Sequence, residues 1–236
     1  MNTINTCAKY TGDSSTESGL RTMRFEIPGT GKSLVTPIFV IPSYAAGDSC
    51  APGAFEEGAT LLISGRLYPH KEDRKMYVVP VQPLQVVNAS NSLNHVHLAG
   101  GVGFIGEQRN PEVFNFGLMC QAPKQKTINH DWQDSLGFRI EAWNDDGKRM
   151  EKFLFVGRQI SLGGALKFEC WTGKDGDKRT NYKIRVKSSQ YSFFGKNQKP
   201  DVTKGAPPEA FESPHQQAIA KPAVYIKDPV DVGIPF

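Results

Sequence analysis

The sequence predicts an all-β chain: two tandem five-stranded barrels, each with a short helix, followed by a disordered C-terminal tail. The 23 Gly and 16 Pro residues among 236 favour short strands and many turns over long helices. Apolar residues recur at every second position in several segments, which is the period of a half-buried strand. We therefore expect one barrel in residues 1–90, a second in 91–198 and the tail in 199–236.

Two barrels are expected because one pattern occurs twice, 99 residues apart and without a gap. At this offset Phe39 matches Phe138, Tyr44 matches Trp143, Gly58 matches Gly157 and Gly65 matches Gly164. The residues between the paired glycines keep apolar side chains at alternate positions in both copies. The chain is therefore interpreted as a strongly diverged tandem duplication.

Each copy shows five strands with an irregular or helical segment after the third. In the first copy we expect strands at Thr3–Lys9, Thr22–Ile27 and Leu34–Tyr44, irregular structure at Ala45–Glu57, and a hairpin over Thr60–Val87. In the second we expect strands at His95–Gly101, Val113–Gln121 and Phe138–Trp143, a polar loop at Ala122–Leu136, and a helix with Asn144 as its N-cap. This order of elements is that of an OB-fold barrel, which binds oligonucleotides on an open face.

The second copy ends in a long hairpin that carries most of the candidate binding residues. One face is apolar, with Ile160, Leu162, Leu166, Phe168, Tyr182, Ile184 and Val186. The other face combines cations with an aromatic ring, in Lys167, Trp171, Lys178, Arg179, Lys183 and Arg185. Cations follow the phosphates of a single strand and rings stack on its bases, at roughly 1–3 kcal/mol per base. The alternative is that Trp171 is a strand residue half covered by a neighbour.

Charge is distributed unevenly along the chain. Residues 1–90 hold 8 Lys+Arg and 8 Asp+Glu and are neutral, whereas residues 91–199 hold 17 and 11, a net charge of +6. Residues 200–236 have a net charge of −2. The second copy is therefore the segment expected to attract a polyanion.

The segment from Trp143 to Gly195 resembles the bacterial single-stranded DNA-binding protein family. The shared features are the aromatic residue ending strand three, the helix, the Gly-x-x-Val-x-Ile-x-Gly-like run 157–164, Trp-Thr-x-x-x-Gly at 171–176 and the Phe194-Gly195 close. The resemblance extends from about Asn94, and in the first copy it is carried mainly by Phe55 to Leu67. It implies a homodimer in which four OB-folds surround the strand.

The resemblance and the hairpin pattern together nominate a set of strand-binding residues. In the second copy these are Trp143, Trp171, Phe138, Trp132, Arg139, Lys167, Lys178, Arg179 and Tyr182. Phe138 and Trp143 face opposite sides of one strand, so only one of them is expected to stack on bases, and Trp143 is favoured. The alternative for Trp143 is a core position between sheet and helix. In the first copy the candidates are Tyr44, Tyr68, Arg66, Lys71, Arg74 and Lys75. That copy is neutral and has no Trp, so we expect a weaker binder or an assembly partner.

The C-terminal segment is polar, Pro-rich and expected to be disordered. Its end resembles the family's acidic tip, which docks on replication and repair enzymes; here the tip residues are Asp231, Ile234, Pro235 and Phe236. The side chain of Phe236 suits an apolar pocket, and its carboxylate suits Arg or Lys. Only two Asp precede the tip, so the docking is expected to be weak.

No cofactor and no metal are expected, because the four cysteines and five histidines are scattered and form no ligand cluster. No apolar run of membrane-spanning length and no secretion leader is evident, so we expect a cytoplasmic, nucleoid-associated protein. A nuclease would need clustered carboxylates. The candidates Asp145, Asp146, Asp175 and Asp177 are accounted for by a helix start and a turn.

The function we expect is sequence-independent binding and protection of single-stranded DNA in replication, recombination and repair, with recruitment of partner enzymes through the tip. The alternative is an OB-fold protein-interaction module of a replication or restart complex that binds nucleic acid only weakly. The two differ in whether binding survives the loss of Trp171.

Overall fold

The computed structural model describes residues 1–15, 19, 21–29, 34–51, 53–70, 74–88, 93–107, 110–122, 135–173 and 175–195. All of them belong to one compact unit, Met1–Lys199. A second unit, Pro200–Phe236, lies outside the described residues, and so does the predicted disordered tail.

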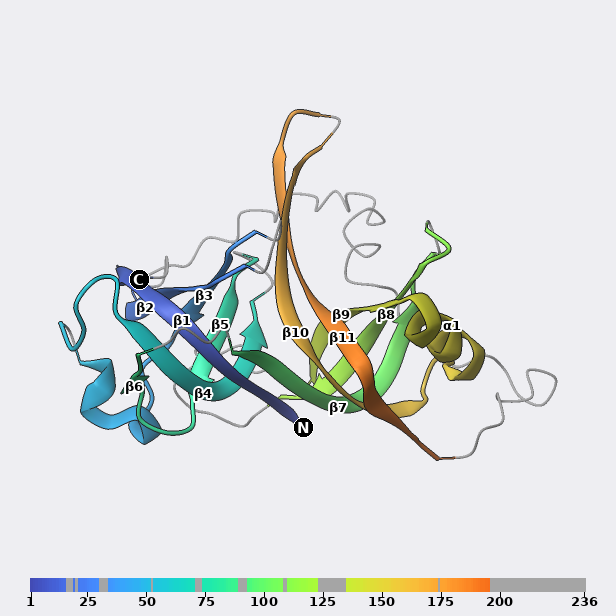
Figure 1. Cartoon of the computed structure of the whole chain (residues 1–236), viewed down its shortest axis with the longest axis horizontal. Helices are drawn as coiled ribbons and strands as arrows, with labels where there is room; N and C mark the ends of the chain where they lie inside the picture. Colours follow the sequence, from blue (N-terminus) through green and yellow to red (C-terminus); the bar gives the residue numbers. More distant parts are fainter. Residues whose placement is uncertain are drawn as a thin grey trace, which may run out of the picture. The chain divides into compact units, whose positions relative to one another are not determined.

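The first barrel is formed by strands that close on themselves (Figure 1). Its elements are β1 (Asn2–Ser15), β2 (Arg21–Ile27), β3 (Thr36–Val40), the 3-10 helix η1 (Tyr44–Cys50), β4 (Thr60–Pro69), β5 (Met76–Pro80) and β6 (Gln85–Val86). Hydrogen-bonded neighbours run β1–β2–β3–β5–β4 and back to β1, with β3 and β5 parallel. Alternate residues such as Ile4, Phe25 and Ile63 point inward and are fully buried. This ring of five strands is an OB-fold.

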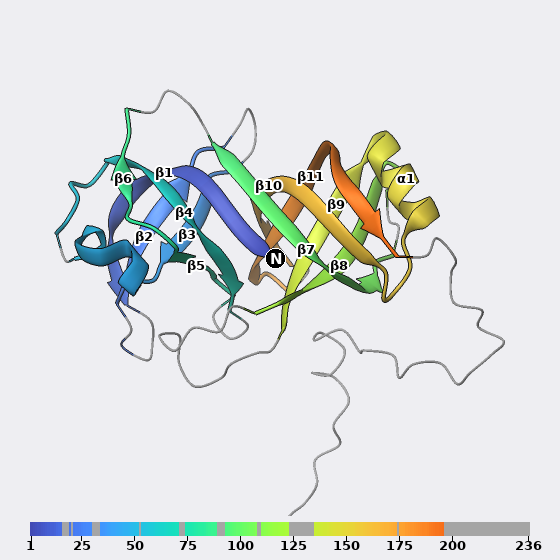
Figure 2. The ribbon, with the colours of Figure 1, turned by 90° about the horizontal axis from the view of Figure 1, so that it is seen from below.

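The second barrel repeats this order. Its elements are β7 (Asn94–Ile105), β8 (Val113–Gln121), β9 (Ser135–Trp143), α1 (Asn144–Phe153), β10 (Gln159–Thr172) and β11 (Lys178–Phe194). The ring runs β7–β8–β9–β11–β10 and back to β7, and β9 and β11 are its parallel pair. Helix α1 lies beside β8 and β9 (Figure 2). The predicted all-β class with two tandem OB-folds is confirmed.

The two barrels share one continuous sheet. Strand β1 pairs antiparallel with β7, from Asn2 opposite Leu98 to Thr6 opposite Asn94. A second connection is made by Tyr182 on β11, whose hydroxyl donates a hydrogen bond to the carbonyl of Pro37 on β3 (2.9 Å). The hairpin of the second barrel is thereby held against the first.

The duplication is visible in the backbone as well as in the sequence. Gly58 and Gly157, matched by the 99-residue offset, have nearly the same positive φ, 94° and 90°. These left-handed conformations favour glycine, and each precedes an equivalent strand, β4 or β10. Inward residues also match in these strands, with Leu61 over Ile160 and Ile63 over Leu162. In this part of the repeat the predicted offset agrees with the structure.

The same offset is wrong by one residue in the third strand. Val40 and Ile140 are the inward residues that pair with β5 and β11, opposite Val78 and Ile184, so the offset there is 100. The ungapped alignment would place inward Val40 on exposed Arg139. The first barrel therefore has one residue more than the second between strand three and Gly58, where η1 replaces α1.

Two local predictions are also corrected. Strand β3 ends at Val40, before the predicted end at Tyr44, and Tyr44 instead begins η1. Asn144 is not a side-chain cap: the cap position of α1 is Trp143, it makes no side-chain cap hydrogen bond, and Asn144 itself has φ 52°. Met150 and Leu154 on and after this helix are buried.

Candidate nucleic-acid interface

The outward residues of β9, β11 and β10 form a continuous surface on the second barrel, here called the outer face. It consists of Arg139, Glu141, Trp143, Lys183, Arg185, Lys167, Glu169 and Trp171. The opposite, inward residues of the same strands, such as Ile140, Leu166 and Ile184, are buried at 1% exposure or less. The predicted separation of an apolar and a basic-aromatic side of the hairpin is confirmed for these residues, but Lys178 pairs with Thr172 and so lies on the opposite face from Trp171, contrary to the prediction.

Trp143, the last residue of β9, lies on the outer face beneath a cation. The guanidinium of Arg185 lies over its indole ring, with Cζ 4.9 Å from the ring centroid. Arg185 Nε donates a hydrogen bond to Oε1 of Glu141 (2.5 Å). The Glu141 side chain is only 3% exposed, whereas that of Arg185 is 43% exposed. The carboxylate is therefore buried beneath the cation that it orients.

The other cations near this point are partly neutralised. Lys183 Nζ lies 2.7 Å from Glu169 Oε2 and 3.7 Å from Glu141 Oε2. Burial and the positive charge of Arg185 lower the pKa of Lys167, against the opposite influence of Glu141. The carboxylates of Glu141 and Glu169 therefore offset part of the positive charge of Lys183 and its neighbours on this face.

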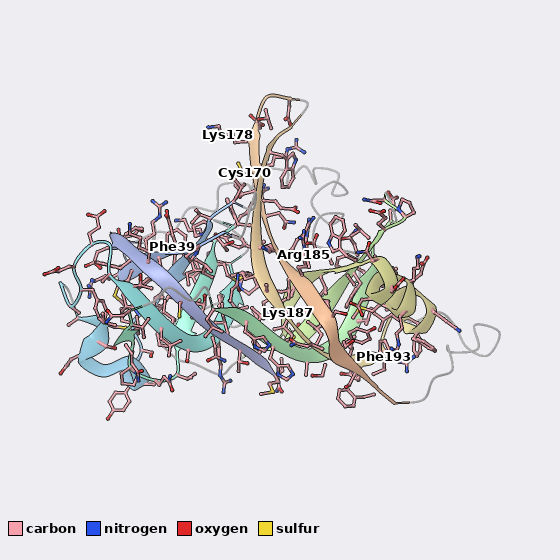
Figure 3. The ribbon with its side chains drawn as sticks, viewed as in Figure 1. Phe39, Cys170, Lys178, Arg185, Lys187 and Phe193 are labelled. Carbon is pink, nitrogen blue, oxygen red and sulfur yellow. The ribbon has the colours of Figure 1, made fainter. Side chains whose placement is uncertain are left out.

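The hairpin of β10 and β11 extends away from the barrel, and its far part, residues 167–172 and 178–183, is here called the arm (Figure 1). Trp171 lies on the arm opposite Arg179 and is 44% exposed. Lys178, at the start of β11, is exposed, and Arg179 forms an ion pair with Asp175. Figure 3 shows Lys178 on the far part of the hairpin and Arg185 nearer the barrel. An exposed indole beside a cation can stack on an unpaired base.

Two predicted residues of the second copy have other roles. Phe138 is 3% exposed and points inward with Ile140, so it belongs to the core and cannot be a stacking platform. Tyr182 is half-buried, packs on Phe168 with a centroid distance of 5.0 Å, and bonds to Pro37. Tyr182 is therefore a contact between the barrels. Trp132 lies outside the described residues.

One aromatic residue of this surface was not predicted. Phe104 on β7 is half-buried and lies over Gly117 of β8, where a Cβ atom would collide with its ring. Gly117 is opposite Arg139, so the ring lies beside the outer face. A glycine in the middle of an otherwise apolar strand signals the close approach of another group. The glycine in the sequence therefore indicates where another group approaches the strand, but it does not indicate that the group is Phe104.

The first barrel presents a different surface at the equivalent place. Tyr68 and Tyr77 are cross-strand neighbours, 5% and 3% exposed, and Phe39 packs on Tyr77 at 5.8 Å. Lys75 Nζ lies 5.1 Å from the Phe39 ring centroid. Tyr68 is therefore not an open platform, contrary to the prediction, because it is covered in an aromatic cluster. This buried cluster occupies the place that Lys167 and Lys183 take in the second barrel.

The remaining first-barrel candidates do not form one site with this aromatic cluster. Tyr44 is fully exposed on η1, beyond the end of β3, and does not correspond to Trp143. Arg66 and Arg74 are exposed, and Arg74 has φ 55°. Lys71 lies outside the described residues, as do the tip residues Asp231, Ile234, Pro235 and Phe236.

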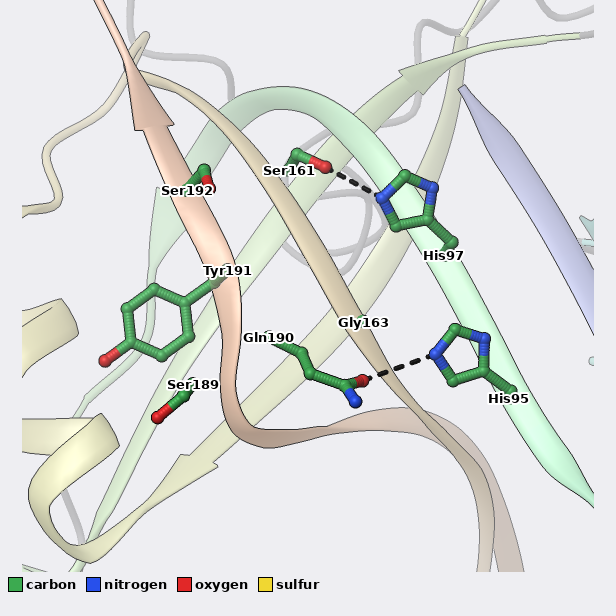
Figure 4. Close-up of a pocket in the computed structure, with 8 residues that line it drawn as sticks. All are labelled: His95, His97, Ser161, Gly163, Ser189, Gln190, Tyr191 and Ser192. Atoms are coloured by element: carbon green, nitrogen blue, oxygen red, sulfur yellow. Dashed lines mark hydrogen bonds between the residues drawn. The ribbon is translucent and has the colours of Figure 1, made fainter.

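A polar pocket lies on another side of the second barrel (Figure 4). It forms where four residues of β11, 187–190, bulge opposite Gly163. His95 Nε2 lies 3.3 Å from Gln190 Oε1, and His97 Nε2 lies 2.9 Å from Ser161 Oγ. Among the described residues no group of three or more His, Cys, Asp or Glu side chains is arranged to hold a metal.

No helix within the described ranges is long and apolar enough to cross a membrane. The two tandem OB-folds, one with a basic and aromatic outer face, define the class of oligonucleotide-binding barrels. Residues 93–192 match the model of the single-strand binding protein family. The second barrel is therefore similar to the single-strand binding protein family over nearly its whole length. The resemblance noted in the sequence is confirmed.

Solved structures show the same tandem architecture. The single-stranded DNA-binding protein from Thermus aquaticus, as a deletion mutant, has a TM-score of 0.56 at 14% identity, covering 85% of this chain and 98% of that one. The wild-type Thermus aquaticus protein has a TM-score of 0.56 at 13% identity, covering 83% and 94%. Identities this low establish the fold alone. No curated protein matches the chain by sequence.

Proposed function

We propose that this protein binds single-stranded DNA without sequence preference, through the outer face and the arm of the second barrel. The observation that carries the proposal is Trp171, a 44% exposed indole paired across the arm with Arg179, inside the segment that matches the family model. Every base has a π-face, so stacking on Trp171 accepts any sequence.

Phosphate contacts are assigned to exposed cations of the second barrel and its arm. Arg139, Lys178 and Lys187 are exposed and form no ion pair with a described carboxylate. Each phosphate that such a cation neutralises releases counterions, so the logarithm of affinity falls with the logarithm of salt by about 0.7 per contact on a single strand. A binding constant independent of salt would exclude these assignments.

The second barrel is proposed as the main binding unit and the first as its structural partner. This proposal is supported by the residues at the equivalent place in the two barrels. The second barrel has Lys167 and Lys183 there, whereas the first has the buried Tyr68 and Tyr77. Removing an exposed first-barrel cation through Arg66→Gln should therefore weaken binding less than Arg139→Gln. The reverse order would assign the strand to the first barrel.

The test of binding is a titration of tryptophan fluorescence with poly(dT) and with a matched duplex, at low and at high salt. We expect quenching by the single strand only, a defined number of nucleotides per protein, and weaker binding at high salt. Absence of quenching and of binding by a second method, such as gel shift, would reject the proposal. That outcome would favour the protein-interaction function, for which the neutralised cations Lys183 and Arg185 are the supporting observation.

The cellular role proposed is to cover exposed strands during replication, recombination and repair in the cytoplasm, and to recruit enzymes through Phe236 and the tip. Full-length protein and Phe236→Ala are compared as baits. Replication or repair enzymes retained only by the unchanged protein would support recruitment, with equal poly(dT) binding as the control. Identical sets of retained proteins would contradict it.

A homodimer with four OB-folds is also proposed. The chain mass is 26.0 kDa, so light scattering of the full-length protein should give about twice that value. A mass equal to that of one chain across the accessible concentration range would reject the dimer.

A further inference from the structure

The indole ring of Trp143 on the outer face is covered by the guanidinium group of Arg185. Arg185 lies over Trp143 with its Cζ 4.9 Å from the ring centroid, and its side chain is 43% exposed. The indole beneath is only half-exposed, and its Nε1–H is buried with no acceptor among the described residues. A base that approaches from solvent therefore contacts the guanidinium group of Arg185 and not the indole ring of Trp143.

Glu141 fixes the orientation of that plane. Its Oε1 accepts the Nε–H of Arg185 at 2.5 Å, and the two residues are direct neighbours on the parallel strands β9 and β11. Arg185 uses Nε alone for this bond, and its terminal nitrogens have no hydrogen-bond acceptor among the described residues. They remain available to a phosphate or to a base edge.

We propose that Arg185 is the residue on which a base stacks in the second barrel, with Trp143 as its support and Glu141 as its positioning residue. A guanidinium is planar and delocalised, so it stacks on bases as well as on aromatic rings. On one side it is held by the cation–π contact with Trp143. On the other it meets the base. This proposal rests on the proposed binding of single-stranded DNA.

The position of Glu141 indicates that it orients Arg185 and does not merely balance the charge of the face. A carboxylate on a polyanion-binding face repels phosphates, and burying it is unfavourable unless it is paired. Glu141 is 3% exposed and paired with Arg185, and with Lys183 at 3.7 Å. Holding the guanidinium over the indole is a use for a buried carboxylate that phosphate attraction alone does not supply.

The test compares Arg185→Lys with the unchanged full-length protein. Lysine keeps the positive charge but has neither the plane nor the Nε–H. We expect affinity for oligo(dT) to fall about tenfold, with the salt dependence unchanged. On an abasic oligonucleotide of equal length, which has phosphates but no bases, the two proteins should bind equally. A matched control is Lys148→Gln, which removes a charge from helix α1. It should not change the ratio of the affinities for oligo(dT) and for the abasic oligonucleotide.

Two further variants separate the roles of the neighbours. Trp143→Phe keeps an aromatic support and should weaken oligo(dT) binding less than Arg185→Lys. Glu141→Gln removes a negative charge from the face, yet it should weaken binding of oligo(dT) because Arg185 loses its orientation. Thermal melts confirm that each variant is folded, and because Arg185 is 43% exposed its substitution does not open the core.

The outcomes are distinct. Equal oligo(dT) affinity of Arg185→Lys and the unchanged protein would overturn the stacking role, and tighter binding by Glu141→Gln would overturn the positioning role. An equal loss of affinity for the abasic ligand would make Arg185 a phosphate contact. If the unchanged protein itself does not bind oligo(dT), the proposed function fails and not only this inference.

Discussion

Gly164 lies against the main chain of Arg185 so closely that a Cβ atom at residue 164 would be 2.6 Å from the Arg185 carbonyl oxygen. Gly65 has the same relation in the first barrel, where a Cβ atom would be 2.7 Å from the carbonyl oxygen of Val79. Backbone atoms in a closed barrel cannot move aside without disturbing both neighbouring strands. Glycine is thus required where β4 crosses β5 and where β10 crosses β11.

Substitution of Gly164 by alanine should therefore destabilise the fold. We expect Gly164→Ala to lower the free energy of unfolding by about 1–3 kcal/mol, the usual range for overpacking, as measured by urea denaturation. The control is Gly101→Ala, whose Cβ would meet only the side-chain amide of Gln159, at 3.0 Å. That flexible group can move, so the free energy of unfolding of the control should fall less. Equal losses would contradict the close crossing.

Removal of the indole on the arm should weaken binding and leave the fold intact. Trp171 is 44% exposed, so Trp171→Ala should melt close to the unchanged protein, while poly(dT) affinity falls by about 1–3 kcal/mol. Tyr44→Ala, which removes a fully exposed ring from the first barrel, is the matched control and should bind normally. Unchanged affinity of Trp171→Ala would support the protein-interaction alternative.

Thiol reactivity should distinguish one cysteine from the other three. Cys170 is exposed, whereas Cys7, Cys50 and Cys120 are buried. Burial raises the pKa of the Cys120 thiol to about 11, so roughly one molecule in a thousand carries its thiolate at pH 8. We expect one thiol to react rapidly with Ellman's reagent in the folded protein and four in urea.

Two changes check the assignment of that thiol. Cys170→Ser should abolish the rapid reaction, and poly(dT) should change its rate little in the unchanged protein because Cys170 and Trp171 are consecutive on β10 and point to opposite faces of the arm. Rapid reaction of a second thiol would contradict the described burial. Strong protection by poly(dT) would place the strand on the Cys170 face of the arm and not on the Trp171 face.

Alkaline pH should destabilise the first barrel through Tyr10. Burial, together with the hydrogen bond from its hydroxyl to Asp13 Oδ1 (2.8 Å), raises the pKa of Tyr10 from 10.0 to about 12. The fold therefore favours the neutral phenol. The resulting stabilisation is complete below pH 10 and is lost as pH rises from 10 to 12.

The measurement is the urea midpoint at several pH values in this window. Tyr10→Phe cannot ionise, so its midpoint should decline less steeply from pH 10 to 12 than that of the unchanged protein. Tyr44→Phe, at a fully exposed position, should keep the original slope. Parallel slopes for all three proteins would show that Tyr10 does not contribute to alkaline unfolding.

Local periodicity was enough to predict the strands, because each strand buries alternate residues whatever its neighbours are. The faces of the hairpin follow from Leu166 and Ile184 on one side and Lys167 and Arg185 on the other. Periodicity could not show that the third strands are displaced by one residue. Phe138 and Phe39 match in the sequence, yet they point to opposite faces, because the segment that follows each strand differs in length.

The sequence by itself determined two OB-folds, their repeated glycines and a basic second barrel, since these depend on residue type and spacing along the chain. Only the tertiary structure decided what covers each side chain. Tyr68 is buried in a cluster with Tyr77, and Trp143 lies beneath Arg185. Exposure depends on contacts between strands that are distant in the chain, and no pattern along one strand records them.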